Sequence, residues 1–143
     1  AAYGFFIVLS KLFLSEKRTT LIPVKRPHIV VTGAARGLGE MILQELFKTG
    51  EEMIITGVDL SWEAEEIKVP NNVKLIKLSA DLSEEQNVRD LWAKIVTTGP
   101  VHLLINNAGV AKKKLFKELE FKSYVHTFKT NLFAPVLLTK LFL

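Results

Sequence analysis

Thr32-Gly33-Ala34-Ala35-Arg36-Gly37-Leu38-Gly39 joins a β-branched apolar run, residues 29–31, to an amphipathic pattern that begins at Leu38. A strand, a glycine-rich turn and a helix in this order form a cradle for phosphate. The N-terminus of a helix has unpaired N–H groups and a partial positive charge, so a pyrophosphate can bind there without a dedicated cation. The octapeptide therefore predicts a dinucleotide site at the end of a strand.

The glycine spacing, G-x-x-x-G-x-G, differs from the usual dinucleotide pattern G-x-G-x-x-G, but each glycine still has a physical role. We expect Gly33 to let the strand turn sharply, Gly37 to let backbone approach the phosphates, and Gly39 to let the helix pack close to the sheet. No Gly-Lys-Ser/Thr follows the glycines, which argues against a P-loop nucleotidase.

The remaining sequence alternates apolar strand patterns with helical patterns, which predicts an α/β fold with a doubly wound parallel sheet, the Rossmann arrangement. Pro70, Gly99 and Pro100 separate the elements, and Ser83 is the expected N-cap of one helix. We expect the sheet to be truncated after about four strands, with its cofactor crevice at their carboxyl ends. The predicted strands are residues 29–32, 53–58, 73–78 and 102–106, and the predicted helices are residues 38–49, 61–68, 83–98 and 122–143.

An apolar segment, residues 3–14, precedes this domain and is followed by basic residues. It has three readings: a truncated membrane anchor, which we favour, an interfacial anchor or signal remnant, and a helix packed on the domain. A spanning helix needs about 20 apolar residues, and the basic flank would place the following domain in the cytosol. We expect an anchor and linker at residues 1–27 and a dinucleotide-binding domain, incomplete at its C-terminus, at residues 28–143.

Composition excludes several functional classes. The chain of 143 residues has 48% hydrophobic residues and no cysteine, so it is globular and has no disulfide framework or thiolate metal site. Its formal net charge of +4 is not arranged as a basic stripe with interleaved aromatics, which argues against nucleic-acid binding. His28, His102 and His126 have no metal-ligand spacing, so no metal is expected. Lys112, Lys113 and Lys114 form a solvated loop or contact lipid headgroups.

Polar residues follow each predicted strand. Asp59 ends the second strand, where a carboxylate accepts hydrogen bonds from the adenosine ribose and repels a 2′-phosphate, which favours NAD over NADP. Arg36 favours the opposite choice, because a guanidinium in the turn can hold a phosphate. If the turn binds nothing, Asp59 is only a solvated loop acid. Asp81 and Leu82 are placed to meet the adenine, and residues 106–109 (NNAG) are placed beside the nicotinamide ribose.

The octapeptide, Asp59, Asp81-Leu82, residues 106–109 and Asn131 together resemble the amino-terminal half of a short-chain dehydrogenase/reductase over residues 28–143. The apolar leader resembles the membrane-anchored retinol dehydrogenases and 17-beta-hydroxysteroid dehydrogenases of types 11 and 13. The resemblance implies hydride transfer between NAD, or less favourably NADP, and an alcohol or carbonyl carbon. It implies cofactor contacts from Thr32, Gly33, Ala35, Arg36, Gly37, Leu38, Gly39, Asp59, Leu60, Asp81, Leu82, Asn107, Ala108 and Gly109.

Within the catalytic set that the resemblance implies, only the asparagine has a counterpart here, Asn131, which in the family helps to hold a water in the proton relay. Tyr124 and Lys129 are five residues apart and precede Asn131, so they are not the family's Tyr-x-x-x-Lys. Because the chain begins at Ala1 and ends at Leu143 within a helical pattern, we expect a fragment. The resemblance implies that the family's serine, tyrosine and lysine lie beyond Leu143, so we expect this fragment to be inactive by itself.

The resemblance further implies a lipophilic alcohol or carbonyl substrate such as a retinoid or steroid, a membrane surface at the endoplasmic reticulum or a lipid droplet with the domain facing the cytosol, and possible homo-oligomers. Two other functions stay open. One is a dinucleotide-binding pseudoenzyme or sensor without catalysis, and the other is a structural membrane protein that binds no cofactor.

Overall fold

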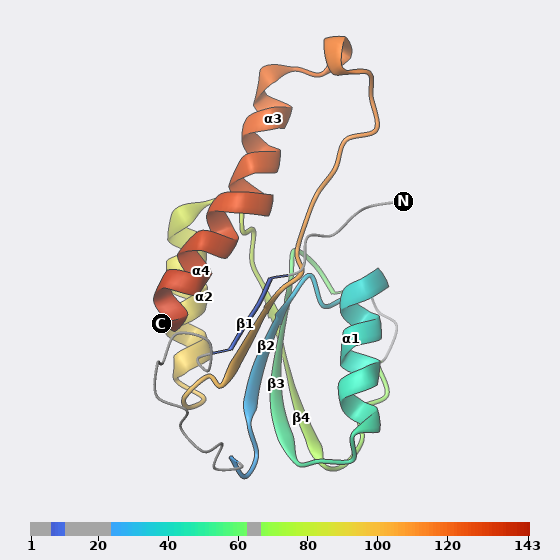
Figure 1. The fold of residues 1–143 in the computed structure, drawn as a ribbon, viewed down its shortest axis with the longest axis vertical. Coiled ribbons are helices and arrows are strands. Elements are labelled where there is room, and N and C mark those ends of the chain that lie inside the picture. The colour runs from blue at the N-terminus through green and yellow to red at the C-terminus, as the bar shows by residue number, and fades with distance from the viewer. Residues whose placement is uncertain (1–6, 11–23, 63–66) are drawn as a thin grey trace.

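The computed structural model describes residues 7–10, 24–62 and 67–143, which form a five-stranded sheet with helices on both faces (Figure 1). The strand order is β1-β5-β2-β3-β4. Strands β2, β3, β4 and β5 are parallel, and β1 is an antiparallel edge strand. The bounds are β1 Ile7–Ser10, β2 His28–Thr32, β3 Met53–Asp59, β4 Val73–Ser79 and β5 Leu103–Asn106.

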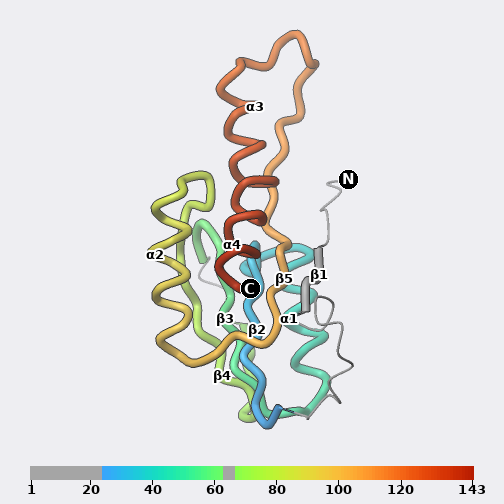
Figure 2. Tube along the Cα trace, turned by 60° about the vertical axis from the view of Figure 1, so that its left-hand side comes forward, coloured from blue at the N-terminus to red at the C-terminus, as the bar shows by residue number. Residues whose placement is uncertain are grey.

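Helix α1 (Gly37–Lys48) covers one face of the sheet, and helices α2 (Glu85–Val96) and α4 (Ala134–Phe142) cover the other (Figures 1 and 2). Alternate residues of β2 point to opposite faces, because successive side chains of a strand alternate. Val30 packs with α2 and α4, whereas Val31 packs with α1. Both central faces are thus apolar, as the continuous apolar runs predict for a parallel sheet between two helical layers.

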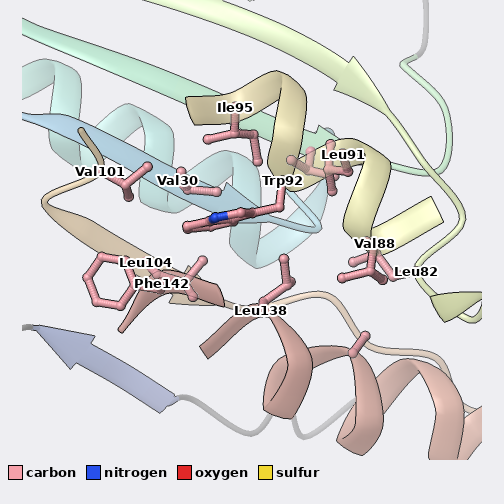
Figure 3. Close-up of a cluster of buried hydrophobic side chains, with 12 residues drawn as sticks. Val30, Leu82, Val88, Leu91, Trp92, Ile95, Val101, Leu104, Leu138 and Phe142 are labelled. Carbon is pink, nitrogen blue, oxygen red and sulfur yellow. The ribbon is translucent and has the colours of Figure 1, made fainter. Parts of the chain in front are cut away.

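The core beneath α2 and α4 is shown in Figure 3. Trp92 of α2 meets Phe142 of α4 edge to face, with ring centroids 6.4 Å apart. Leu104 of β5 and Leu138 of α4 are almost completely buried in the same cluster. This packing fixes α4 against β5, and so fixes the segment that carries Asn131 relative to the end of the sheet.

The predicted anchor differs from the structure at residues Ile7–Ser10. These residues form β1, which pairs antiparallel with β5, so that Ile7 is opposite Asn106 and Ser10 is opposite Leu103. β-Branched residues favour strands, and the pairing covers an edge of β5 that would otherwise present free N–H and C=O groups. The other residues of the predicted anchor, 3–6 and 11–14, lie outside the described part. Among the described residues, no helix has the length and apolar character needed to cross a membrane.

Two predicted helical features also differ from the structure. Ser83 is not an N-cap: helix α2 begins at Glu85 with Glu84 at the N-cap, because the Asp81 carboxylate accepts the Ser83 N–H at 2.9 Å and holds Ser83 in the preceding turn. The helix predicted over residues 61–68 is absent from its described residues, 61–62 and 67–68, while 63–66 lie outside the described part.

The predicted C-terminal helix is confirmed and has three segments. Helix α3 (Phe121–Phe128) continues through a π-helical turn, η3 (Lys129–Phe133), into α4, so the path is continuous through Pro135. Pro135 is tolerated because it occupies the first turn of α4. A short 3₁₀ turn, η2 (Phe116–Glu118), precedes α3.

Candidate dinucleotide-binding site

The glycine-rich turn lies where the strand order reverses. From β2 the chain crosses to β3 on one side, whereas β5 pairs with β2 on the other, so the carboxyl ends of β2 and β5 border the crevice that open α/β sheets use for ligands. Gly33 leaves β2 with a φ of 65°, and the Ala34 N–H donates to the Val58 carbonyl at 3.1 Å. The turn is therefore joined to β3 and ends directly at the start of α1.

The three glycines of the turn have different surroundings. A Cβ at Gly39 would lie 1.8 Å from the Gly33 carbonyl oxygen, and one at Gly33 would lie 2.8 Å from the Ala108 Cα. These two positions therefore allow backbone segments to pack closely. Gly37 has a φ of 55°, and a Cβ there would meet nothing within 4 Å. It thus presents backbone to open space beside the N-terminus of α1, which no side chain caps.

Thr32 and Asn107 join the ends of β2 and β5. The Thr32 hydroxyl accepts the N–H groups of Asn107 and Ala108, each at 3.0 Å. The Asn107 side-chain amide donates in return to the carbonyls of Thr32 and Gly33, each at 3.0 Å. This bracket holds the NNAG segment against the glycine turn. Sequence reasoning named Thr32 and Asn107 as cofactor contacts and missed the part of the Thr32 hydroxyl in this bracket, whose one sequence signal is a threonine that ends an otherwise apolar strand.

Asp59 supports the turn directly. Its Oδ2 accepts the Ala35 N–H at 2.9 Å, and its Oδ1 accepts the Leu60 N–H at 2.8 Å. Arg36 approaches the same carboxylate, with Nη2 3.7 Å from Oδ1, although its own side chain is 61% exposed. The acid and the base that favour different cofactors are thus neighbours. Each carboxylate oxygen can accept two hydrogen bonds, so acceptor capacity remains for a ribose hydroxyl.

Trp62 supports the segment that follows β3. Its indole N–H donates to the Leu78 carbonyl at 3.0 Å, and its ring covers Gly57, where a Cβ would lie 2.7 Å from the ring. The segment that carries Asp59 and Leu60 is thereby held against the end of β4.

Asp81 and Leu82 follow β4, as predicted, but their side chains differ in exposure. Leu82 is buried in the core beneath α2, so only its backbone can face a ligand. The hydrogen bond from Ser83 to Asp81 lowers the pKa of that carboxyl, so Asp81 is ionised at neutral pH. Asn106 is directed away from the turn, since its amide donates to the Thr139 hydroxyl at 3.3 Å.

Asn131 lies within the π-helical turn η3 and bonds to Val110, just beyond the NNAG segment. Its Oδ1 accepts the Val110 N–H at 2.8 Å, and its Nδ2 donates to the Val110 carbonyl at 2.9 Å. Pro135, four residues later, has no N–H to donate to the Asn131 carbonyl. π-Helical turns of this kind occur often at functional sites. Tyr124 is separate from this group, because its hydroxyl donates to the Phe116 carbonyl. In the described part of the chain, no cluster of acidic residues and histidines could hold a metal.

Comparison with known proteins assigns this chain to a family. The family described as short chain dehydrogenase matches residues 27–143. The 3-oxoacyl-[acyl-carrier-protein] reductase FabG of Aquifex aeolicus is 30% identical over 115 residues, which cover 78% of this chain and 46% of that protein. The chain thus spans about half the length of the curated relatives it matches.

Two solved structures share the fold. A 4-hydroxyisoleucine dehydrogenase complexed with NADH is 20% identical, with a TM-score of 0.66, over 80% of this chain and 47% of that one. A blue fluorescent protein from a metagenomic library, in complex with NADPH, is 23% identical, with a TM-score of 0.63, over 80% and 49%. With the family match over most of its length and the glycine turn, NNAG segment and Asn131 brought together, this chain is a member of the short-chain dehydrogenase family.

Proposed function

We propose that this chain is the cofactor-binding half of an NAD(P)-dependent oxidoreductase that interconverts an alcohol and a carbonyl. The observation that carries the proposal is the turn from Gly33 to Gly39, which leaves open space at Gly37 and is braced by Asp59 and Asn107. The reductase activity named for the Aquifex relative supports the same class of reaction.

The residues present fit a dinucleotide. The turn at Gly37 and the N-terminus of α1 would hold the pyrophosphate, because uncapped N–H groups and the helix dipole favour an anion. Asp59 would hold the adenosine ribose, and Ala108 and Gly109 would lie beside the nicotinamide half. When bound, the nicotinamide cofactor accepts or supplies the hydride. Asn131 would position a proton-relay water near its carbonyl, while its side chain fixes Val110.

We propose NAD as the preferred cofactor. Asp59 is 10% exposed and is held by two backbone N–H groups, so its negative charge cannot move aside for a 2′-phosphate. Arg36 favours NADP, but its charge is already close to Asp59. Solved relatives of this fold bind either NADH or NADPH, so both cofactors belong in the test.

Calorimetric titration of the chain with NADH and NADPH tests the proposal, with Gly37→Val as the critical variant. A valine at Gly37 would occupy the space where phosphate approaches, and we expect NADH binding to be lost. Gly50→Val is a matched control, since Gly50 also has a positive φ and open space but lies at the far end of α1. Equal NADH affinity of the Gly37 and Gly50 variants would show that the turn does not contact the cofactor. Absence of NADH and NADPH binding by the unmodified chain would refute the proposal.

We further propose a lipophilic substrate, a retinoid or steroid, and attachment to the endoplasmic reticulum or a lipid droplet. The apolar sequence of residues 3–14 and its basic flank support this, as does the resemblance to the membrane-anchored retinol and 17-beta-hydroxysteroid dehydrogenases. An anchor that includes Ile7–Ser10 would require their pairing with β5 to open. Fractionation of cells that express the whole protein, with and without serine at the apolar positions of this segment, is the test. Recovery of both forms in the cytosol would contradict the proposal.

A further inference from the structure

Residues 111–122, here called the tip, project away from the sheet between β5 and α3. Figures 1 and 2 both show this segment in orange, extending well beyond the ends of the strands on the side where β2 meets the glycine turn. The 3₁₀ turn η2 (Phe116–Glu118) lies within it. The tip and the candidate cofactor site are therefore at the same end of the molecule.

Large apolar side chains of the tip face solvent. Phe116 is 82% exposed, Phe121 81% and Leu115 61%. Val125 and Phe128 of α3, at helical spacing from Phe121, are also exposed. Several large apolar side chains exposed within one short segment are uncommon on a protein surface unless they bind something.

Basic side chains surround these apolar residues. The five lysines of the tip are all exposed, and its acidic residues are only Glu118 and Glu120, which leaves a net charge of +3 on residues 111–122. Lys122 pairs with Glu120 at 2.6 Å. Among the described residues, the other four lysines have no acidic partner within ion-pair distance; they are Lys112, Lys113, Lys114 and Lys117.

The tip is a folded turn and not only an exposed sequence. The Tyr124 hydroxyl of α3 donates to the Phe116 carbonyl at 2.8 Å, and the two rings lie 5.2 Å apart. The Glu118 N–H donates to the Leu115 carbonyl at 2.9 Å. These contacts hold the backbone of η2 against α3 while the Phe116 ring stays exposed.

We propose that the tip docks on an anionic lipid surface. Phenylalanine and leucine side chains enter the boundary between headgroups and acyl chains, while the surrounding lysines bind anionic headgroups. The charge argues against a second copy of the chain as the occupant, because two tips of +3 would repel each other. Docking in this orientation would turn the cofactor end of the sheet toward the membrane. Resting on the proposed function, this orientation would let a lipophilic substrate pass directly from the membrane into the site.

A single fluorescent label tests the contact, since the chain has no cysteine of its own. Glu118→Cys places an environment-sensitive dye in η2. Lys48→Cys places the same dye in the last turn of α1, at the end of that helix away from the glycine turn. With vesicles of phosphatidylcholine and phosphatidylserine, we expect a blue shift and increased emission from the label at residue 118 only. An equal change at both positions, or none at residue 118, would overturn the proposal.

Variants assayed by vesicle co-sedimentation identify the contributing side chains. Phe116→Ser combined with Phe121→Ser should abolish binding, whereas Met41→Ser, which alters a residue of α1 that is 64% exposed, should not change it. Glutamine at Lys112, Lys113 and Lys114 should weaken binding on the order of 100-fold, because each lysine near an anionic surface contributes roughly five-fold. Vesicles of phosphatidylcholine alone, or added salt, should weaken it similarly.

Every variant keeps residues 1–23, so a difference between variants reports the tip alone. Unchanged vesicle binding by the phenylalanine variant would refute the proposal and assign binding to the leader. Loss of self-association in that variant, without any change in vesicle binding, would assign the surface to a second copy. NADH affinity should be the same in all variants, so failure of lipid docking would leave the proposed cofactor site unaffected.

Discussion

Gly39→Ala should separate helix α1 from the glycine turn. The added Cβ would lie 1.8 Å from the Gly33 carbonyl oxygen and 2.6 Å from its carbonyl carbon. Both atoms are backbone, so no side chain can rotate away to relieve the clash. The Asn107 amide nitrogen would lie 2.8 Å from the same Cβ, so the bracket between β2 and β5 is affected as well.

The size of the displacement sets the expected effect. Moving a 1.8 Å contact to an acceptable separation requires a shift of roughly 1.2 Å or more at the start of α1. Overpacking of this kind costs about 1–3 kcal/mol of stability. Misplacement of a binding group by about 1 Å can cost on the order of 100-fold in function. We therefore expect a moderate loss of stability and a larger loss of NADH affinity.

Urea unfolding and calorimetric NADH titration of the same preparations measure the two effects. Gly50→Ala is the control, because it introduces alanine at a φ of 71° in open space, with backbone strain but no clash. It should lose about 1–2 kcal/mol and keep its NADH affinity. If Gly39→Ala binds NADH as well as Gly50→Ala does, the close contact between α1 and the turn is not what positions the cofactor.

Other perturbations follow from the same contacts. Asp59→Ala should weaken NADH binding and shift the ratio of the NADH and NADPH dissociation constants toward NADPH; an unchanged ratio would exclude Asp59 from cofactor selection. Thr32→Val should lower the free energy of unfolding by about 1–3 kcal/mol, because two N–H groups lose their acceptor, while Thr32→Ser should not, as urea titration would show. Burial lowers the pKa of His28 below 6.5, so the unfolded chain binds a proton at a higher pH than the folded chain does. The free energy of unfolding should therefore fall as the pH drops below about 6.5 toward the lowered pKa. Thermal unfolding of His28→Gln should lack that part of the pH dependence.

The parallel sheet could be predicted from sequence because its central strands, β2 and β3, are buried on both faces and so have nearly continuous apolar runs. The run at residues 29–31 is continuous, and the structure buries Val30 and Val31 on opposite faces. The edge strand β1 could not be predicted in the same way. An apolar stretch such as residues 3–14 has the composition of an anchor or of a strand, and pairing with β5 is a tertiary contact that local pattern does not encode.

The candidate site could be predicted as residue types and not as contacts. Gly33, Asp59 and Asn107 follow strands, and parallel strands end at one edge, so their proximity follows from topology. The partners of each side chain depend on distances that sequence does not contain. The Trp62 bond to Leu78 has no local signal, because it forms when distant elements pack together. The π-helical turn at Asn131 has a local signal only in Pro135, which cannot donate to the Asn131 carbonyl.

Asp59 links cofactor choice to the integrity of the turn. The carboxylate that would repel a 2′-phosphate also accepts the Ala35 N–H inside the glycine turn and pairs with Arg36. Replacing it therefore removes the negative charge beside Arg36 and at the same time releases one amide of the cradle. The first effect should strengthen NADPH binding and the second should weaken both cofactors. It follows that the ratio of the two affinities isolates the electrostatic effect of Asp59, whereas either affinity alone combines it with the loosening of the turn.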